Sequence, residues 1–218
     1  MIRGAIFDFD GTLFDSMFIW ETAGDVYLRS LGKEPEKDLQ KTLKTMSLRQ
    51  SAAYMQRAYS LSASIEEIMD GVNHTVEDFY FNTVQPKPNV IPFLERMKAQ
   101  GIKMCIATAT DRYQVEVALW RCGMDLFFSD IFTCSDVGHG KDEPVIFRRA
   151  LEHLQTTKVD TAVFEDAFHA LQTASDDGFI TVAIYDSHEE RQKELRRLAD
   201  FFLDDYSHTD SFWKFAST

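Results

Sequence analysis

The sequence predicts an α/β protein in which helices cover both faces of a parallel sheet, a three-layer α/β/α arrangement with a helical segment inserted near its start. From residue 93 onward, short apolar runs alternate with stretches of helical periodicity. Residues 17–85, in contrast, show helical periodicity with almost no strand signal. Because another apolar run precedes these residues, the helical segment interrupts the part of the chain that forms the sheet.

The first apolar run covers residues 2–7 and predicts a buried strand that ends at Asp8. In the inserted segment we expect a helix over 17–31, a second from Ser47 to Ala58, and a third after Ser64. Ser64 and Glu67 form a capping-box pattern at the start of that third helix.

A proline-containing stretch, residues 85–92, predicts a linker out of the inserted segment, because proline interrupts a helix. We therefore expect a core domain of residues 1–15 and 87–218 and a second, helical domain of residues 16–86.

The alternation in the last part of the chain predicts five further strands, at 103–107, 127–133, 161–164, 179–184 and 201–203. Helices are expected between them, at 93–100, 111–122, 144–154, 167–176 and 189–199. The aromatic tail that follows, with Phe212, Trp213 and Phe215, is expected to pack on the main domain, with a dimer contact as the alternative.

The composition, 44% hydrophobic and 13% aromatic, is typical of a folded domain. A net charge of −12 argues against nucleic acid or an anionic membrane as a partner, since both would be repelled. No apolar run is long enough to span a bilayer, and the N-terminal run leaves no room for a signal peptide. The three cysteines lack metal-ligand spacing and are expected to be reduced. We thus expect a cytoplasmic protein, a monomer or weak homodimer.

Polar residues stand just beyond four predicted strands, where ligands bind in open parallel sheets. In chain order they are Asp8 and Asp10, Thr108, Lys141, and Glu165 with Asp166. Crowded carboxylates repel one another, and a hard divalent cation such as Mg²⁺ would relieve that repulsion. Thr108 and Lys141 would then suit the oxygens of a phosphate group. Each feature alone is common in loops, but their ordered conjunction favours a functional site.

These motifs resemble those of the haloacid dehalogenase-like superfamily of phosphohydrolases. DFDGTLFDS at 8–16 looks like the first motif, residues 106–110 (IATAT) the second, Lys141 in GKDEPVIF the third, and residues 164–167 (FEDA) the fourth. The inserted helices resemble the small cap of the subgroup that contains β-phosphoglucomutase and phosphoglycolate phosphatase. The resemblance implies a Rossmann-like core and a helical cap domain.

The resemblance also implies roles for the polar residues. Asp8 would be the nucleophile, forming an aspartyl-phosphate, and Asp10 the general acid and then base. The presence of Asp10 favours phosphate chemistry over cleavage of a carbon–halogen bond. Mg²⁺ would be bound by Asp8, the Asp10 backbone carbonyl and Asp166, with Glu165 in support. The phosphate group would be bound by Thr108, the Ala109 N–H and Lys141.

The expected substrate is a small phosphorylated metabolite, and the expected activity a phosphatase. Lys44 and Arg49 in the helical segment could contact an anionic substrate, although a solvated helix face explains them equally well. Trp20 stands where β-phosphoglucomutases typically carry a histidine, which favours a plain phosphatase over the alternative, a phosphosugar mutase. A non-catalytic regulator that binds a phosphorylated ligand is a third alternative. His139, beside the Lys141 loop, is expected to be a solvated loop residue.

Overall fold

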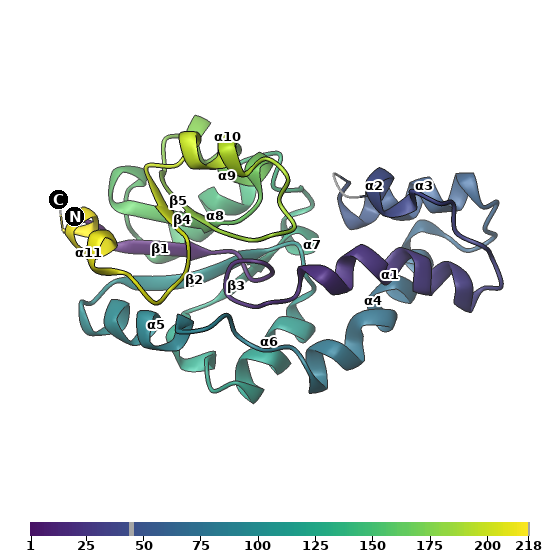
Figure 1. The fold of residues 1–218 in the computed structure, drawn as a ribbon, viewed down its shortest axis with the longest axis horizontal. Coiled ribbons are helices and arrows are strands. Elements are labelled where there is room, and N and C mark those ends of the chain that lie inside the picture. Colours follow the sequence, from purple (N-terminus) through teal and green to yellow (C-terminus); the bar gives the residue numbers. More distant parts are fainter. Residues whose placement is uncertain (44–45, 218) are drawn as a thin grey trace. The chain divides into compact units, whose positions relative to one another are not determined.

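The computed structural model describes residues 1–43 and 46–217, and its strands form one six-stranded sheet. In chain order the strands are β1 (Gly4–Phe7), β2 (Lys103–Thr108), β3 (Ile131–Thr133), β4 (Thr161–Glu165), β5 (Ile180–Ile184) and β6 (Phe201–Leu203). Neighbouring strands are parallel and follow the order β3-β2-β1-β4-β5-β6, with β1 and β4 in the middle (Figure 1). The predicted parallel α/β class is confirmed.

Contacts within the chain divide it into two compact units. The first, Met1–Asp15 with Gln85–Thr218, holds the sheet and the helices α5 (Val90–Ala99), α6 (Arg112–Arg121), α7 (Cys134–Val137), α8 (Val145–Leu154), α9 (Phe168–Asp176), α10 (Gln192–Leu198) and α11 (Asp210–Ala216), with 3₁₀ turns at Asp125–Phe127 and Lys158–Asp160. The second, Ser16–Val84, holds α1 (Met17–Ser30), α2 (Leu39–Leu43), α3 (Leu48–Ala58) and α4 (Ile65–Asn82). That these units act as a catalytic core and a cap stays a prediction.

The start of the returning segment belongs to the first unit rather than to the helices before it. Leu13–Asp15 and Gln85–Lys87 run side by side: the Asp15 N–H donates to the Gln85 carbonyl at 3.1 Å, and the Lys87 N–H to the Leu13 carbonyl at 2.8 Å. An antiparallel bridge joins Phe14 to Pro86 between them. These contacts explain why Gln85 and Pro86 group with the sheet, whereas the sequence had suggested a boundary after residue 86.

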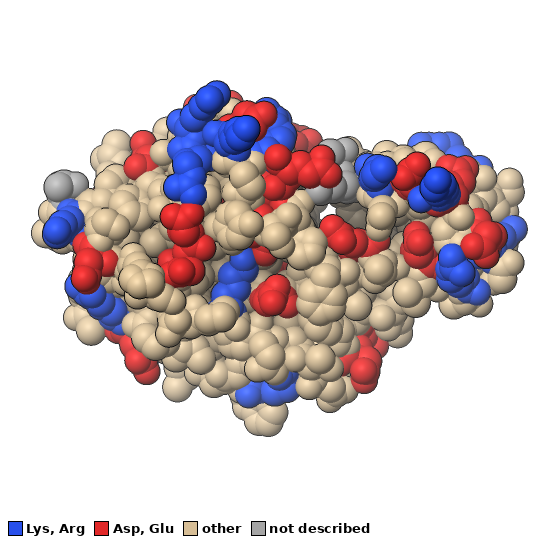
Figure 2. Space-filling model, viewed as in Figure 1, with Lys and Arg blue, Asp and Glu red and all other residues tan. Residues whose placement is uncertain are grey.

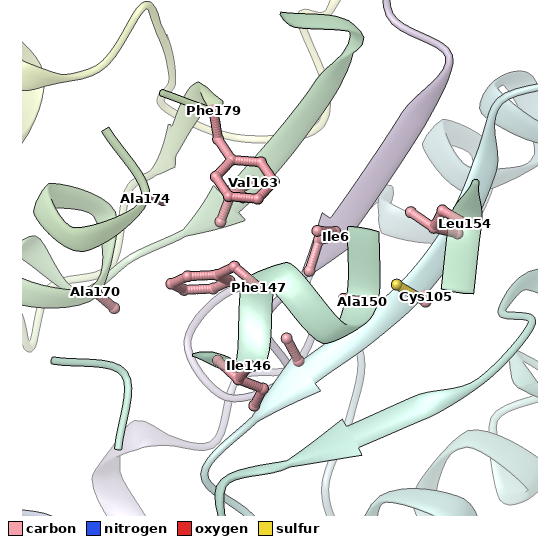
Figure 3. Packing of buried hydrophobic residues seen from close by; sticks show 11 residues of the cluster. Ile6, Cys105, Ile146, Phe147, Ala150, Leu154, Val163, Ala170, Ala174 and Phe179 are labelled. Carbon is pink, nitrogen blue, oxygen red and sulfur yellow. The ribbon is translucent and has the colours of Figure 1, made fainter. Parts of the chain in front are cut away.

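Helices cover both faces of the sheet, which gives the predicted three layers. α8, α9 and α10 pack on one face, and α5, α6 and α11 on the other (Figure 1). On the first face, side chains of β1, β2 and β4 meet those of α8 and α9 in a continuous apolar cluster that includes Ile6, Phe147 and Val163 (Figure 3). Ile6 and Val163 alternate along their strands with Phe7 and Phe164, as expected for strands covered on both sides.

The opposite face is aromatic. The rings of Phe7 and Phe164 stack with centroids 4.2 Å apart, and Phe93 of α5 contacts Phe164 and the fully buried Phe212 of α11. The C-terminal tail therefore packs on the sheet, as predicted. The sequence did not predict that it forms a helix.

Several predicted elements differ in their bounds from those in the structure. The predicted helix 189–199 begins at Gln192. The predicted strand 127–133 is confined to Ile131–Thr133: Phe127 belongs to a 3₁₀ turn, and residues 128–130 form neither helix nor strand. The predicted helix 93–100 begins earlier, at Val90, and takes Pro92 into its first turn. A proline is tolerated there because the first N–H groups of a helix have no partner within the helix.

The helical unit has capping boxes at the starts of α3 and α4, the second of them the predicted Ser64–Glu67 pair. Trp20, half-buried on α1, donates its indole N–H to the Tyr80 hydroxyl of α4 at 2.6 Å. None of the described helices is long and apolar enough to cross a membrane. On the face in Figure 2, acidic side chains lie in several separate places, and basic ones gather over α10.

Candidate active site

The central strands bring the predicted site residues to one edge of the sheet. Phe7, the last residue of β1, is in register with Ile106 of β2 on one side and Phe164 of β4 on the other. Asp8 therefore emerges between the ends of β2 and β4, where Thr108 is the last residue of one strand and Glu165 of the other. Parallel strands present their carboxyl ends on the same side, so the polar residues that the sequence places after them converge.

Three carboxyl groups gather at this edge: one oxygen each from Asp8, Glu165 and Asp166 lie within 4.8 Å of one another. Glu165 and Asp166 are buried, and the Asp8 side chain is 12% exposed. Burial and then the charge of Glu165 raise the pKa of Asp8 from 3.8 to about 6. Burial, Glu165 and Asp8 together raise the pKa of Asp166 well above its usual range. The cluster therefore favours a bound cation.

Lys141 supplies one positive charge to this cluster. Its ammonium group, buried in the loop before α8, lies 2.5 Å from Asp8 Oδ1 and 2.6 Å from Glu165 Oε1. Burial alone would lower the pKa of Lys141, but the two carboxylates outweigh that effect and raise it. One ammonium among three carboxyl groups leaves an excess of negative charge.

Both carboxylate oxygens of Glu165 accept hydrogen bonds from neighbouring groups. Oε1 accepts from Lys141, while Oε2 accepts the backbone N–H groups of Asp166 at 2.9 Å and Ala167 at 3.1 Å. Its side chain thus fixes the lysine and the turn that carries Asp166. This arrangement suits the supporting role expected for Glu165.

The loop of the first motif lies directly on Asp166. Thr12 donates its hydroxyl to Asp166 Oδ1 at 2.9 Å, and both residues are buried. Gly11 has a φ of +69°, and a Cβ atom there would lie closer than 3 Å to the Asp166 carboxyl group. The glycine is therefore needed both for the turn and for the close approach of loop and carboxylate.

Two residues that sequence reasoning did not select also contact the site. Tyr206, buried in the C-terminal segment, donates its hydroxyl to the Thr12 carbonyl at 2.9 Å. Thr110 donates its hydroxyl to Asp10 Oδ2 at 2.5 Å. No local pattern marks Tyr206, whereas Thr110 stands in the second motif, two residues beyond Thr108, and could have been found there.

The residues of the second motif differ in how deeply they are buried. Thr108 is buried and its hydroxyl oxygen accepts the Thr110 N–H at 3.1 Å. Ala109, between them, is exposed. The phosphate contacts expected of Thr108 and of the Ala109 N–H stay predictions.

The last residues that the sequence singled out are Arg49, Lys44 and His139. Arg49 belongs to the helical unit, where it forms an ion pair of 2.7 Å with Glu66 of α4 and has a 61% exposed side chain. Lys44 lies outside the described residues. His139, next to the Lys141 loop, has an exposed side chain whose Nδ1 is 3.2 Å from Glu143 Oε2.

Known proteins are similar to this chain in sequence and in fold. A phosphorylated carbohydrates phosphatase of Thermotoga maritima is 25% identical over 177 residues, 81% of this chain and 82% of that protein. The pyrophosphatase PpaX of Bacillus mycoides is 28% identical over 123 residues, 56% of this chain and 57% of that protein.

A solved structure, a mutant of CbbY from Rhodobacter sphaeroides in complex with xylulose-(1,5)-bisphosphate, matches with a TM-score of 0.85 and 21% identity over 96% of this chain and 97% of that one. The β-phosphoglucomutase of Clostridium difficile matches with a TM-score of 0.79 and 18% identity over 99% and 97%. At these identities, the two structures show a shared fold.

Membership of a family follows from a longer match. The model of one hydrolase family covers residues 5–184, from β1 to the last residue of β5, and so includes all four motifs around the carboxylate cluster. On this evidence the chain belongs to the haloacid dehalogenase-like hydrolases.

Proposed function

We propose that this enzyme is a Mg²⁺-dependent phosphatase that hydrolyses phosphomonoesters of small metabolites through an aspartyl-phosphate on Asp8. One observation carries the proposal: the buried contact of Asp8 with Lys141 at the edge of the Glu165–Asp166 pair. A carboxylate beside an ammonium group and a cation site is suited to attack a phosphorus atom whose oxygens carry negative charge.

The residues at the sheet edge fit Mg²⁺. Their donor atoms are carboxylate oxygens, which this hard cation prefers, and burial makes their negative charge costly without one. Gly11 leaves space beside the Asp166 carboxyl group that a side chain would fill. Asp8, Asp166 and the Asp10 backbone carbonyl would hold the ion, with Glu165 in support. When bound, Mg²⁺ would offset the charge of the carboxylates and of the phosphoryl oxygens.

In the first step, Asp8 attacks the phosphorus atom: an Asp8 oxygen–phosphorus bond forms as the bond from phosphorus to the leaving oxygen breaks. Asp10 gives a proton to that oxygen, so that an alcohol departs. In the second step, Asp10 takes a proton from a water molecule that attacks the aspartyl-phosphate, which restores Asp8 and releases inorganic phosphate. Lys141, the Thr108 hydroxyl and the Ala109 N–H would hold the phosphoryl oxygens throughout.

The nature of the substrate is supported by the relatives rather than by the site alone. One is named a phosphorylated carbohydrates phosphatase and another a pyrophosphatase, and both names describe hydrolysis of small phosphorylated molecules. We accordingly propose phosphorylated sugars as the first compounds to test. Transfer of the phosphate within a sugar, as in a mutase, is the competing outcome.

The test is a phosphate-release assay over sugar phosphates, phosphoglycolate, pyrophosphate and p-nitrophenyl phosphate, with Mg²⁺ or with EDTA. We expect release from at least one compound, its loss with EDTA, and its loss in Asp8→Asn. Asp125→Asn, which changes an exposed carboxylate in the Asp125–Phe127 turn, is the matched control and should stay active. Release that survives Asp8→Asn or EDTA would refute the mechanism. Isomerisation of a hexose phosphate without net release would instead identify a mutase.

A further inference from the structure

We propose that Thr110 is a positioning residue for Asp10: its hydroxyl holds the carboxyl group in the orientation from which the proton is passed to the leaving oxygen. The inference rests on the proposed function, because it gives Thr110 its role through the general acid. It adds to the site a side chain that had no role in the sequence-based prediction.

The contact is buried and joins two neighbouring strands. Asp10 follows β1 and Thr110 follows β2, and the exposed fractions of the two residues are 8% and 3%. The distance from Thr110 Oγ1 to Asp10 Oδ2 is 2.5 Å, at the short end of hydrogen bonds between two oxygen atoms. The threonine hydroxyl is the donor and Asp10 Oδ2 the acceptor, which leaves the other carboxyl oxygen of Asp10 outside this contact.

The threonine itself is fixed by its own strand. Its backbone N–H donates to the Thr108 hydroxyl oxygen at 3.1 Å, and this hydrogen bond stabilises the turn that follows β2. The Asp10 side chain is therefore attached to a part of the sheet edge that also carries the expected phosphate contacts. A carboxyl group held in this way keeps its place relative to the phosphorus atom, and a misplacement of about 1 Å can cost on the order of a hundredfold in rate.

Replacement by valine removes the donor while keeping the branched shape of threonine. If the hydroxyl acts through Asp10, the loss of kcat/KM in the valine variant must depend on how much the leaving group needs a proton. An alkoxide, the leaving group of glycerol phosphate or a sugar phosphate, needs one, whereas nitrophenolate departs without it. A purely structural defect would slow both reactions alike.

The experiment measures kcat/KM with Mg²⁺ for an alkyl phosphate and for p-nitrophenyl phosphate, since this parameter reports the steps up to departure of the leaving group. In Thr110→Val, we expect a drop on the order of 10–100-fold for the alkyl phosphate and less than about threefold for the aryl phosphate. Thr110→Ser, which keeps the hydroxyl, should stay within about threefold of the wild type for both.

The chain offers a matched control in Thr181, a buried threonine of β5. Its hydroxyl donates to Asp200 Oδ2 at 2.9 Å, a threonine–aspartate pair that the site does not use. Thr181→Val should leave the ratio of the two kcat/KM values unchanged. If Thr110→Val does not fold, as judged by its thermal unfolding, Thr110→Ala replaces it in the same comparison with Thr110→Ser.

The outcomes separate the two proposals. Equal losses for both substrates, or no loss in either, would overturn the role of Thr110 while the wild-type activity upholds the proposed function. A wild-type protein that releases phosphate from none of the compounds in the panel of the phosphate-release assay would refute the proposed function and this inference with it. A selective loss for the alkyl phosphate, rescued by serine, would establish Thr110 as a positioning residue.

Discussion

Replacing Asp8 by asparagine should make the metal-free protein more stable at neutral pH while abolishing its activity. In the folded protein, burial and Glu165 raise the pKa of Asp8 from 3.8 to about 6, despite the opposing charge of Lys141. Because folding raises this pKa, the protonated carboxyl group favours the folded state. That contribution is complete below pH 3.8 and is lost as the pH rises to about 6 and beyond.

The size of the effect follows from the pKa difference. The rise from 3.8 to about 6 corresponds to about 3 kcal/mol between acidic and neutral pH. Asparagine has no such titration, so the free energy of unfolding of Asp8→Asn relative to the wild type should increase by about 2–2.5 kcal/mol, most of this amount, between pH 4 and pH 7.5. Asp8 also raises the pKa of Asp166, so removal of its charge lowers that pKa and favours the variant at neutral pH in the same direction. Titrations of groups far from Asp8 are common to both proteins and cancel in the difference.

The assay is urea unfolding of both proteins in EDTA at several pH values, repeated at pH 7.5 with Mg²⁺. In EDTA, we expect the two stabilities to diverge with rising pH, with the variant more stable at pH 7.5. Mg²⁺ should stabilise the wild type and have much less effect on the variant, because Asp8 is an expected ligand. Parallel pH profiles in EDTA would refute the reasoning that the carboxylate cluster is destabilising without a cation.

Three further substitutions, the first with a control, test the packing, the loop and the charges of the sheet-containing unit. Phe212→Ala should lower the free energy of unfolding by about 3–5 kcal/mol in a urea titration, because it removes a buried ring from the cluster that holds α11 on the sheet. Its control is Trp120→Ala, at a residue that is 75% exposed, which should change the free energy of unfolding by less than about 0.5 kcal/mol. Gly11→Ala should lower the free energy of unfolding by about 1–3 kcal/mol, because alanine disfavours the positive φ and its Cβ atom would contact the Asp166 carboxyl group. The same substitution should abolish the rise in melting temperature on addition of Mg²⁺. An unchanged rise would contradict the geometry of the loop. A hydrogen bond from Arg148 holds the pKa of Asp177 below 3.8, so the stabilising contribution of the ionised carboxylate is present above that pH and is lost as the pH falls further. Asp177→Asn should therefore destabilise by about 1 kcal/mol at pH 7 and by progressively less as the pH is lowered below 3.8, as measured by thermal unfolding.

Local patterns were sufficient to predict the part of the site that comes from strand ends. Asp8, Glu165 and Asp166 each follow an apolar run short enough to be a strand, and parallel strands then bring them together. Lys141 joins them from the loop before α8, and the sequence indicated it as the lysine in the loop after the third predicted strand. For these residues, the step from sequence to site needed strand positions and no knowledge of side-chain packing.

The contacts that sequence reasoning missed are individual hydrogen bonds made by the hydroxyl groups of Thr110 and Tyr206. Thr110 meets Asp10 across 100 positions, and Tyr206 meets Thr12 across 194. Nothing in the neighbourhood of either hydroxyl indicates its partner, since the choice depends on the order of strands in the sheet. The early start of α5 has another cause: a proline in a first helical turn gives the same local signal as a proline in a linker.

The central place of β1 has a consequence for how the protein is made. This strand leaves the ribosome before β2 and β4, the two strands that pair with it, and the whole helical unit is synthesised in between. Its four residues, all buried in the finished sheet, must wait without a partner while the helical unit makes contacts of its own. Unpaired apolar strands are prone to aggregate, so the nascent chain is most in need of a chaperone during this interval.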